Sequence, residues 1–285
     1  MVDSNDIRKA SQYSDRWLAK RQAKHVAMVE NSLRKLQNNI IDLLAKIATD
    51  KTGRIEGLKT NLKQVQKIHR EIEKLFAKDF SADMKKVIND FSYVTSAIKN
   101  SYAYLNIATK FTSIDKKVMD VLKDGYYQNY LALGNTQKNK IIQSIYDQVI
   151  ANAPYSQLIA SIEGAVVGKK SVVGTPLSTY AKTYANDFIM NFHNEVNLSK
   201  AKTAKLTHFL YVGNIIKDSR DFCIVRAGKY YTTAQINSWT FRWQGKSGPA
   251  MTHRGGYNCR HHWQAIKPSW LKGANEIEIQ NWFTE

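Results

Sequence analysis

The sequence predicts an α+β protein, with a mainly α-helical, elongated N-terminal body and a small C-terminal α+β module. Two observations predict the helical body. The chain has no proline before Pro154 and only two glycines before Gly125, and apolar residues recur there every three or four positions. A third observation predicts the module, because short β-branched or aromatic segments begin near His208 and five of the six tryptophans follow residue 238.

Three regions follow from these patterns: a helical body over 1–200, an α+β module over 201–268 and a tail over 269–285. Within the body, a coiled-coil-like helical hairpin is expected over about 20–78, because two apolar stripes at helical spacing flank a glycine-bearing turn at 49–57. We favour packing of both stripes in the protein's own core, and self-association through the helices stays open. The stripes are Val26, Val29, Leu33, Leu36, Ile40, Leu43 and Ile47, and Leu58, Leu62, Val65, Ile68, Ile72 and Leu75.

Local signals divide the rest of the chain into shorter elements. A residue that can cap a helix precedes each of three further helical patterns, and Pro176 stands at the first turn of the last long helix. The expected starts are Ser81, Thr112 or Ser113, and Asn135 or Thr136, and the apolar positions of the last helix are Leu177, Tyr180, Tyr184, Phe188 and Phe192. The expected strands are FLYV, NIIK, GKYY and WQAI, which turn residues separate.

The charge of the chain favours polyanionic partners. Forty-two Lys and Arg against 24 Asp and Glu give a net charge of +18, and the positive charge is spread along the chain. We expect basic helical faces to contact double-stranded DNA without sequence preference, although the sequence does not identify the DNA-contacting residues. A lysine-rich surface that serves solubility alone is the alternative. No run of about 18 apolar residues and no signal-peptide core occurs, so we expect neither membrane insertion nor export.

Two cysteines and two histidines of the module have the chemistry of zinc ligands: Cys223, His253, Cys259 and His261. On an extended segment Cys259 and His261 project to the same face and can share one metal. The usual paired-cysteine signature is missing, because Arg226 stands three residues after Cys223. A structural zinc and a disulfide between the cysteines therefore stay open, and we favour reduced thiols buried as small hydrophobic groups.

Charged residues flank both cysteines. We expect Asp218 or Asp221 to form a structural ion pair with Arg260, or Arg220 to donate to a backbone carbonyl. Three glycines are expected at tight reversals that bring the two cysteine-bearing segments together, so their replacement should damage the fold rather than a reaction. They are Gly228, Gly255 and Gly256.

We expect no enzymatic activity. No HExxH, GxSxG, Walker or kinase signature is present. A cysteine with a nearby histidine could act as nucleophile and base, and adjacent histidines could serve a metal-dependent nuclease. A thiol within CRHHW on an aromatic-rich segment is more typical of a structural role.

The order of motifs between Pro176 and Pro268 resembles the C-terminal domain of the phage Mu F-like minor head proteins, also called the head morphogenesis or SPP1 gp7-like family of tailed bacteriophages. A helix TYAKTYANDFIMNFHNEVN precedes a strand FLYVG, then DSRDFC, a G-K-Y element, a tryptophan-bearing spacer and a closing GGYNCRH. His261 stands where many relatives carry a further cysteine. The resemblance depends on Asp218, Arg220, Cys223, Gly228, Asn258, Cys259 and Arg260.

The resemblance implies a minor virion protein that is assembled in the host cytoplasm and lies inside the head near the portal. Its implied partners are the portal protein, the major capsid protein and packaged DNA, and its implied role is head assembly or genome packaging and delivery. Two alternatives stay open. One is a metal-dependent nuclease or toxin-like effector carried in the virion, which would use His253, His261 or His262, and the other is a protein ejected with the genome.

Overall fold

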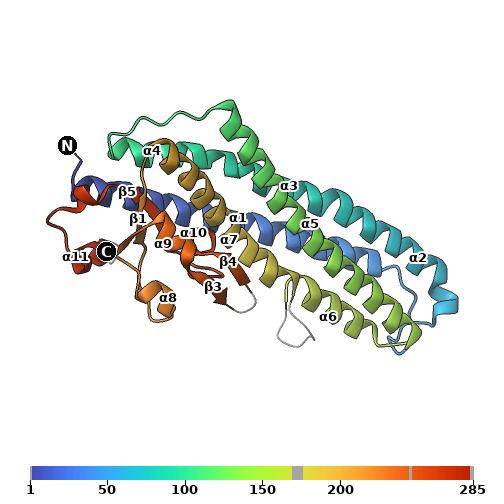
Figure 1. The fold of residues 1–285 in the computed structure, drawn as a ribbon. Coiled ribbons are helices and arrows are strands. Elements are labelled where there is room, and N and C mark those ends of the chain that lie inside the picture. The colour runs from blue at the N-terminus through green and yellow to red at the C-terminus, as the bar shows by residue number, and fades with distance from the viewer. Residues whose placement is uncertain (1, 169–175, 244–245, 283–285) are drawn as a thin grey trace. The chain divides into compact units, whose positions relative to one another are not determined.

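The computed structural model describes residues 2–168, 176–243 and 246–282 (Figure 1). It is mainly α-helical, with small antiparallel sheets near the C-terminus, so the predicted α+β class is confirmed. Among the described residues, no helix combines the length and the apolarity that a membrane crossing needs.

Two compact units can be distinguished, and each draws on several stretches of sequence. We call them the hairpin unit, formed by Lys24–Asn89 and Asp124–Ala185, and the module unit, formed by Met1–Ala23, Asp90–Lys123 and Asn186–Glu285. The boundaries that the sequence suggests near residues 200 and 268 stay a prediction.

The hairpin unit contains most of α1 and all of α2. The long helix α1 spans Ser4–Leu44, α2 spans Leu58–Lys74, and the chain reverses direction between them (Figure 1). The predicted stripes are largely buried, but Leu62 is 43% exposed and the neighbouring Asn61 is buried in its place. Asn61 is held there because its side chain accepts a hydrogen bond from the amide of Ala48 and donates to the carbonyls of Ala48 and Glu56.

Two of the predicted helix starts are wrong. A π-helix, η1, spans Leu75–Phe80 and joins α2 directly to α3 (Ser81–Asn89), so Ser81 lies inside a helical run. Helix α5 spans Ser113–Ile150 and continues through Asn135 and Thr136. Packing explains this continuity, because a Cβ at Gly134 would lie 2.6 Å from the ring of Phe80, and only glycine permits the close approach.

Helices α6 and α7 complete the hairpin unit. Helix α6 spans Tyr155–Val166, and α7 spans Leu177–Thr203 and continues into the module unit. The apolar face of α7 differs from the prediction at Tyr180, which is 46% exposed, because Ala181 and Ala185 take the buried positions.

The module unit is built around a three-stranded antiparallel sheet of order β2-β1-β5. The strands are β1 (His208–Val212), β2 (Tyr230–Thr232) and β5 (His262–Ile266). A second sheet pairs β3 (Thr240–Trp243) with β4 (Lys246–Pro249). The predicted strand NIIK is wrong: this segment is irregular, and the hydroxyl of Ser219 accepts from the amide of Ile216 in a turn.

Short helices surround this sheet. They are η2 (Asp90–Tyr93), α4 (Val94–Tyr104), α8 (Asp221–Ile224), α9 (Thr233–Ser238), α10 (Ala250–His253), η3 (Pro268–Leu271) and α11 (Glu276–Asn281). A core cluster joins α1 to the sheet and to the expected tail, where Leu271 and Ile279 are buried. Its members are Ile7, Ala10, Leu105, Leu210, Val212, Ile266, Leu271 and Ile279.

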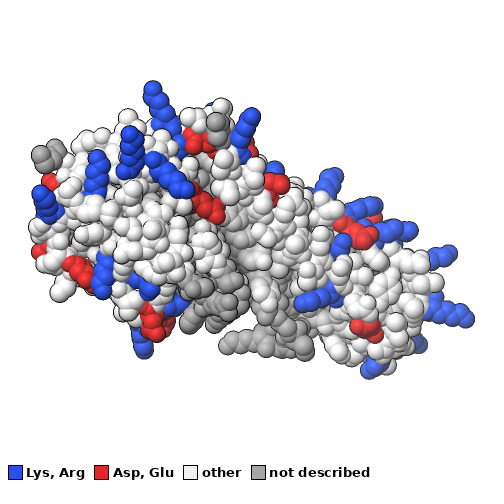
Figure 2. All heavy atoms as spheres, in the orientation of Figure 1, with Lys and Arg blue, Asp and Glu red and all other residues white. Residues whose placement is uncertain are grey.

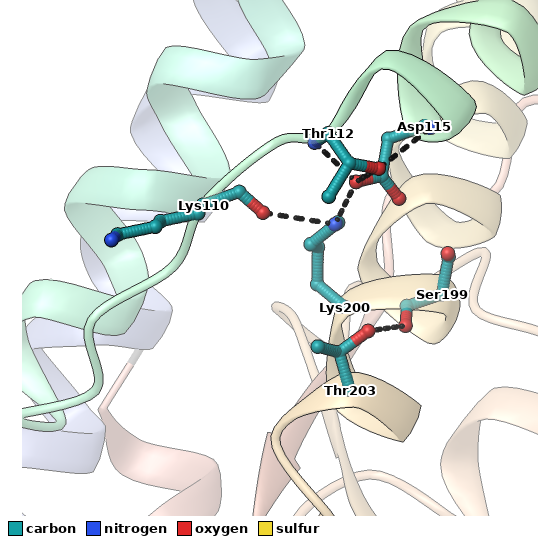
Figure 3. A network of polar contacts seen from close by, with 6 residues as sticks. All are labelled: Lys110, Thr112, Asp115, Ser199, Lys200 and Thr203. Atoms are coloured by element: carbon teal, nitrogen blue, oxygen red, sulfur yellow. Dashed lines mark hydrogen bonds and ion pairs between the residues drawn. The ribbon is translucent and has the colours of Figure 1, made fainter.

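A buried ion pair connects α5 to α7 within the module unit (Figure 3). Lys200 Nζ lies 2.6 Å from Asp115 Oδ2 and also donates to the carbonyl of Lys110. The same carboxylate accepts from the amide and hydroxyl of Thr112, so Thr112 caps α5, as the sequence predicts. Burial opposes ionisation of Asp115, but the hydrogen bonds from Lys200 and Thr112 lower its pKa.

Candidate metal centre

A stripe of buried polar side chains on α7 positions the segment that carries the second cysteine. Asp187 Oδ1 accepts from the amide of Asn258 at 2.8 Å, just before Cys259. Asn197 Nδ2 donates to the carbonyl of Trp263 at 2.7 Å, in β5. Sequence reasoning missed this stripe, although its signal is present: Asp and Asn are disfavoured inside helices, yet they recur here at helical spacing. The stripe is Asp187, Asn191, Asn194 and Asn197.

The first cysteine stands on the short helix α8. The guanidinium of Arg220 donates to the carbonyl of Tyr257 at 2.6 Å, which ties the Cys223 segment to the segment that precedes Cys259. This contact is one of the two arrangements expected from the sequence.

The other expected arrangement, an ion pair with Arg260, is not formed among the described residues. Asp218 and Arg260 line the same pocket without pairing, and Asp221 is exposed at the first turn of α8. Arg260 instead interacts electrostatically with Asp15 of α1. Burial raises the pKa of Asp15, and His261, Arg260 and Arg16 oppose this shift. No sequence pattern links Asp15 to the module.

Three potential metal ligands converge between β1, α8 and β5. The Sγ atoms of Cys223 and Cys259 lie 3.7 Å apart, and both thiols are free and buried. His261 Nδ1 lies 3.8 Å from Cys259 Sγ, and the three ligand atoms are all within 4.8 Å of one another. His253 is not part of this group. It ends α10, and its imidazole packs against Gly248 of β4, where a Cβ would collide with the ring.

The pKa values of the two thiols shift in opposite directions. The hydrogen bond from Cys223 holds the pKa of the Cys259 thiol well below its usual range, against the effect of burial and with help from His261. The same hydrogen bond and burial raise the pKa of Cys223. The contact between the sulfurs therefore favours the thiolate on Cys259 over the thiolate on Cys223, and a thiolate is the form that binds metal.

Tyr211 of β1 closes the inner side of the cluster. Its hydroxyl lies 3.4 Å from Cys223 Sγ and 3.5 Å from Cys259 Sγ, and its ring stacks on His261 with centroids 5.1 Å apart. Burial and the adjacent thiols raise the pKa of Tyr211, so it stays a neutral phenol that can donate to a thiolate.

Two of the three predicted glycines lie at close approaches, and the third has a backbone conformation that favours glycine. A Cβ at Gly255 would collide with Cys223 Sγ and lie 3.2 Å from Cys259 Sγ, so only glycine allows the thiols to meet. Gly228 has a φ of +80°, and a Cβ there would lie 2.8 Å from the carbonyl oxygen of Glu276. Gly256 has a φ of +98°, which side-chain-bearing residues rarely adopt.

His262 belongs to a separate, fully enclosed polar group. Its ring centroid lies 6.0 Å from that of His193, with the two rings nearly perpendicular. Burial lowers the pKa of both rings, that of His193 to about 4, and the charge of the buried Arg254 adds to this effect. Both histidines are therefore neutral at pH 7 and are not among the residues that line the pocket beside the thiols.

No family model matches the chain, and neither a curated protein nor a solved structure matches it. The structure itself shows a mainly helical protein with a small α+β module. In this module, two cysteines and a histidine form a potential metal-binding triad.

Proposed function

We propose that the chain is a minor structural protein of a phage head, which binds the portal protein and major capsid protein inside the virion and contacts packaged DNA without sequence preference. It acts in head assembly or in genome packaging and delivery, and it is not an enzyme. Six of the seven residues that carry the family resemblance line one pocket beside the thiols. The resemblance therefore depends on one spatial cluster rather than on scattered matches.

The observation that carries the DNA contact is a basic face on α2, formed by Lys59, Lys63, Lys67, Arg70 and Lys74. All five side chains are exposed, and Figure 2 shows Lys and Arg side chains projecting from the surface over α2. At 100° per residue they fall within about 80° of arc along about 22 Å of helix. The buried side of α2 lies opposite, at Val65, Ile68 and Ile72. Such a row suits the regularly spaced phosphates of a duplex.

Salt-dependent DNA binding tests this contact. Exchange of Lys59, Lys63 and Lys67 for Gln should weaken binding to duplexes of any sequence. The slope of log K against log salt should become shallower by up to about 2.7, at about 0.9 per phosphate contact. The matched control exchanges Lys46, Lys51 and Lys140, which are exposed elsewhere in the hairpin unit. Equal losses in both variants would show that net charge alone, and not the basic face, governs binding.

We further propose that the triad holds a structural zinc ion. Zinc–sulfur bonds of about 2.3 Å at a tetrahedral angle put two sulfurs about 3.8 Å apart, and a sulfur and an imidazole nitrogen about 3.6 Å apart. The separations of 3.7 and 3.8 Å are close to these values. A bound zinc would hold β5 and α8 together through Cys223, Cys259 and His261.

Metal binding to the purified protein tests the zinc proposal. Because both cysteines bind metal as thiolates, zinc binding should release protons and the zinc affinity should fall as the pH falls. Cys259→Ser should abolish tight binding, whereas His253→Ala should leave it unchanged, since His253 is not part of the triad. Equal loss of zinc affinity in both variants would contradict this assignment.

A metal-dependent nuclease is the second candidate, and one observation favours it. The triad offers three ligands, as catalytic zinc sites do, beside a pocket that Asp218 and two arginines also line. Incubation of plasmid DNA with the zinc-loaded protein and with His261→Ala separates the two functions. We expect no cleavage by either protein, and His261-dependent cleavage would replace the structural proposal with the enzymatic one.

A further inference from the structure

The triad forms part of the wall of a surface pocket of about 260 Å³ in the module unit. Cys223, Cys259 and His261 all line it, so the ligand atoms are reached from this side. On the inner side, Tyr211 Oη lies against both sulfurs, and Gly255 leaves no room for even a methyl group. A tetrahedral ion on the triad would therefore have its fourth coordination position toward the pocket.

The charges around that position favour an anion. A zinc ion with two thiolates and a neutral imidazole has no net charge. The remaining charged residues of the lining are Arg220, Arg260 and Asp218, which together are positive by one. Arg260 is exposed and has no hydrogen-bond partner among the described residues, so its guanidinium is available to a ligand. Asp15, which also acts on Arg260, is not part of the lining.

We infer that this pocket binds a phosphate group, with one oxygen on the metal and others on the guanidinium of Arg260. Guanidinium groups match phosphate oxygens in geometry and charge. The pocket is smaller than the roughly 300–1,000 Å³ of sites that enclose drug-sized ligands, so it accepts one phosphate rather than a whole nucleotide. The inference requires the proposed metal, and the phosphate comes either from a DNA backbone or from free phosphate.

Cobalt(II) provides a probe that reports the fourth ligand directly. The protein is loaded with cobalt in place of zinc, and its visible absorption is followed during titration with inorganic phosphate and then with a short DNA duplex. Phosphate should shift the metal-centred bands. The Arg260→Gln variant should need roughly tenfold more phosphate for the same shift, as expected for loss of a charge-assisted hydrogen bond.

The control is Lys202→Gln, which removes one exposed charge from the same unit but not from the pocket. It should titrate as the unchanged protein does. A shift with DNA identifies the backbone phosphodiester as the ligand, and a shift with inorganic phosphate alone identifies free phosphate.

The possible failures differ from one another. If cobalt gives the sulfur-to-metal absorption but phosphate shifts nothing, the inference fails and the metal site stands. Bands that move in Asp218→Asn without any phosphate would make Asp218 the fourth ligand, which also overturns the inference. If cobalt does not bind, the metal proposal and the inference fail together.

Discussion

Gly255 decides whether the two thiols can share a metal. Its Cα faces both sulfurs, and a methyl group would occupy the space of Cys223 Sγ. A glycine two residues after His253 predicts a turn, and this prediction needs only the local sequence. The close sulfur approach depends on a contact with residue 223, which no local pattern encodes.

Gly255→Ala should separate the thiols and destabilise the module. Overpacking of a filled site costs about 1–3 kcal/mol, and zinc affinity should fall with it. Gly125→Ala is the control, because a Cβ at Gly125 meets no other atom within 4 Å, and it should stabilise α5 by up to about 1 kcal/mol. Urea unfolding and a zinc competition assay measure both effects. Undiminished zinc affinity in Gly255→Ala would contradict the role assigned to this glycine.

At the scale of the elements, helices α5 and α7 are joined by the ion pair between Asp115 and Lys200. No local sequence pattern predicts this pair. Lys200 is 3% exposed and Asp115 is 15% exposed, and each is one of many charged residues in the chain. The predicted helix start is confirmed at Thr112, where the side chain caps α5. The predicted starts are wrong at Ser81 and Asn135, where packing keeps the helix going in spite of a capping residue.

Lys200→Met should destabilise the protein by about 3 kcal/mol, because it leaves the Asp115 carboxylate partly buried without its cation. Asp115→Asn in the Lys200→Met background should recover part of this loss, since it removes the unpaired charge. Thermal or urea unfolding of Lys200→Met, Asp115→Asn and the double variant measures the coupling energy between the two side chains as a double-mutant cycle. Strictly additive losses would show that the two side chains are not coupled.

For the whole molecule, the buried histidines make stability depend on pH. His193 has a pKa of about 4 in the folded protein and an ordinary value of 6.5 when exposed. Between these values the unfolded chain binds a proton that the folded chain does not. Stability therefore falls as pH drops from 6.5 to 4, by up to about 3 kcal/mol for this residue. His262 shifts in the same direction.

Urea unfolding between pH 4 and pH 7.5, in a chelator, measures this dependence. His193→Gln should flatten it in part, because His262 still contributes. His208→Gln is the control, since His208 is near the surface at the start of β1, and it should leave the dependence unchanged. An identical slope in His193→Gln and the parent protein would exclude His193 as a source.

The sequence predicts the large features better than the site. Helical periodicity and the late tryptophans identify the helical part and the small module, because burial imposes its period on a continuous stretch. The triad needs three residues brought together by β5, α8 and the polar stripe of α7. Cys259 and His261 could be paired from their spacing alone, but the choice of Cys223 and the exclusion of His253 depend on tertiary contacts.

The core cluster of the module unit joins residues from the two ends of the sequence. Ile7 and Ala10 are buried against Leu210, Ile266 and Ile279. During synthesis, the first turns of α1 are made long before these partners, so the apolar side of α1 stays exposed until the chain has been made as far as Ile279. Synthesis that stops before Ile279 should therefore yield a chain that aggregates or recruits chaperones. The module unit can form its complete core only after α11 has been made.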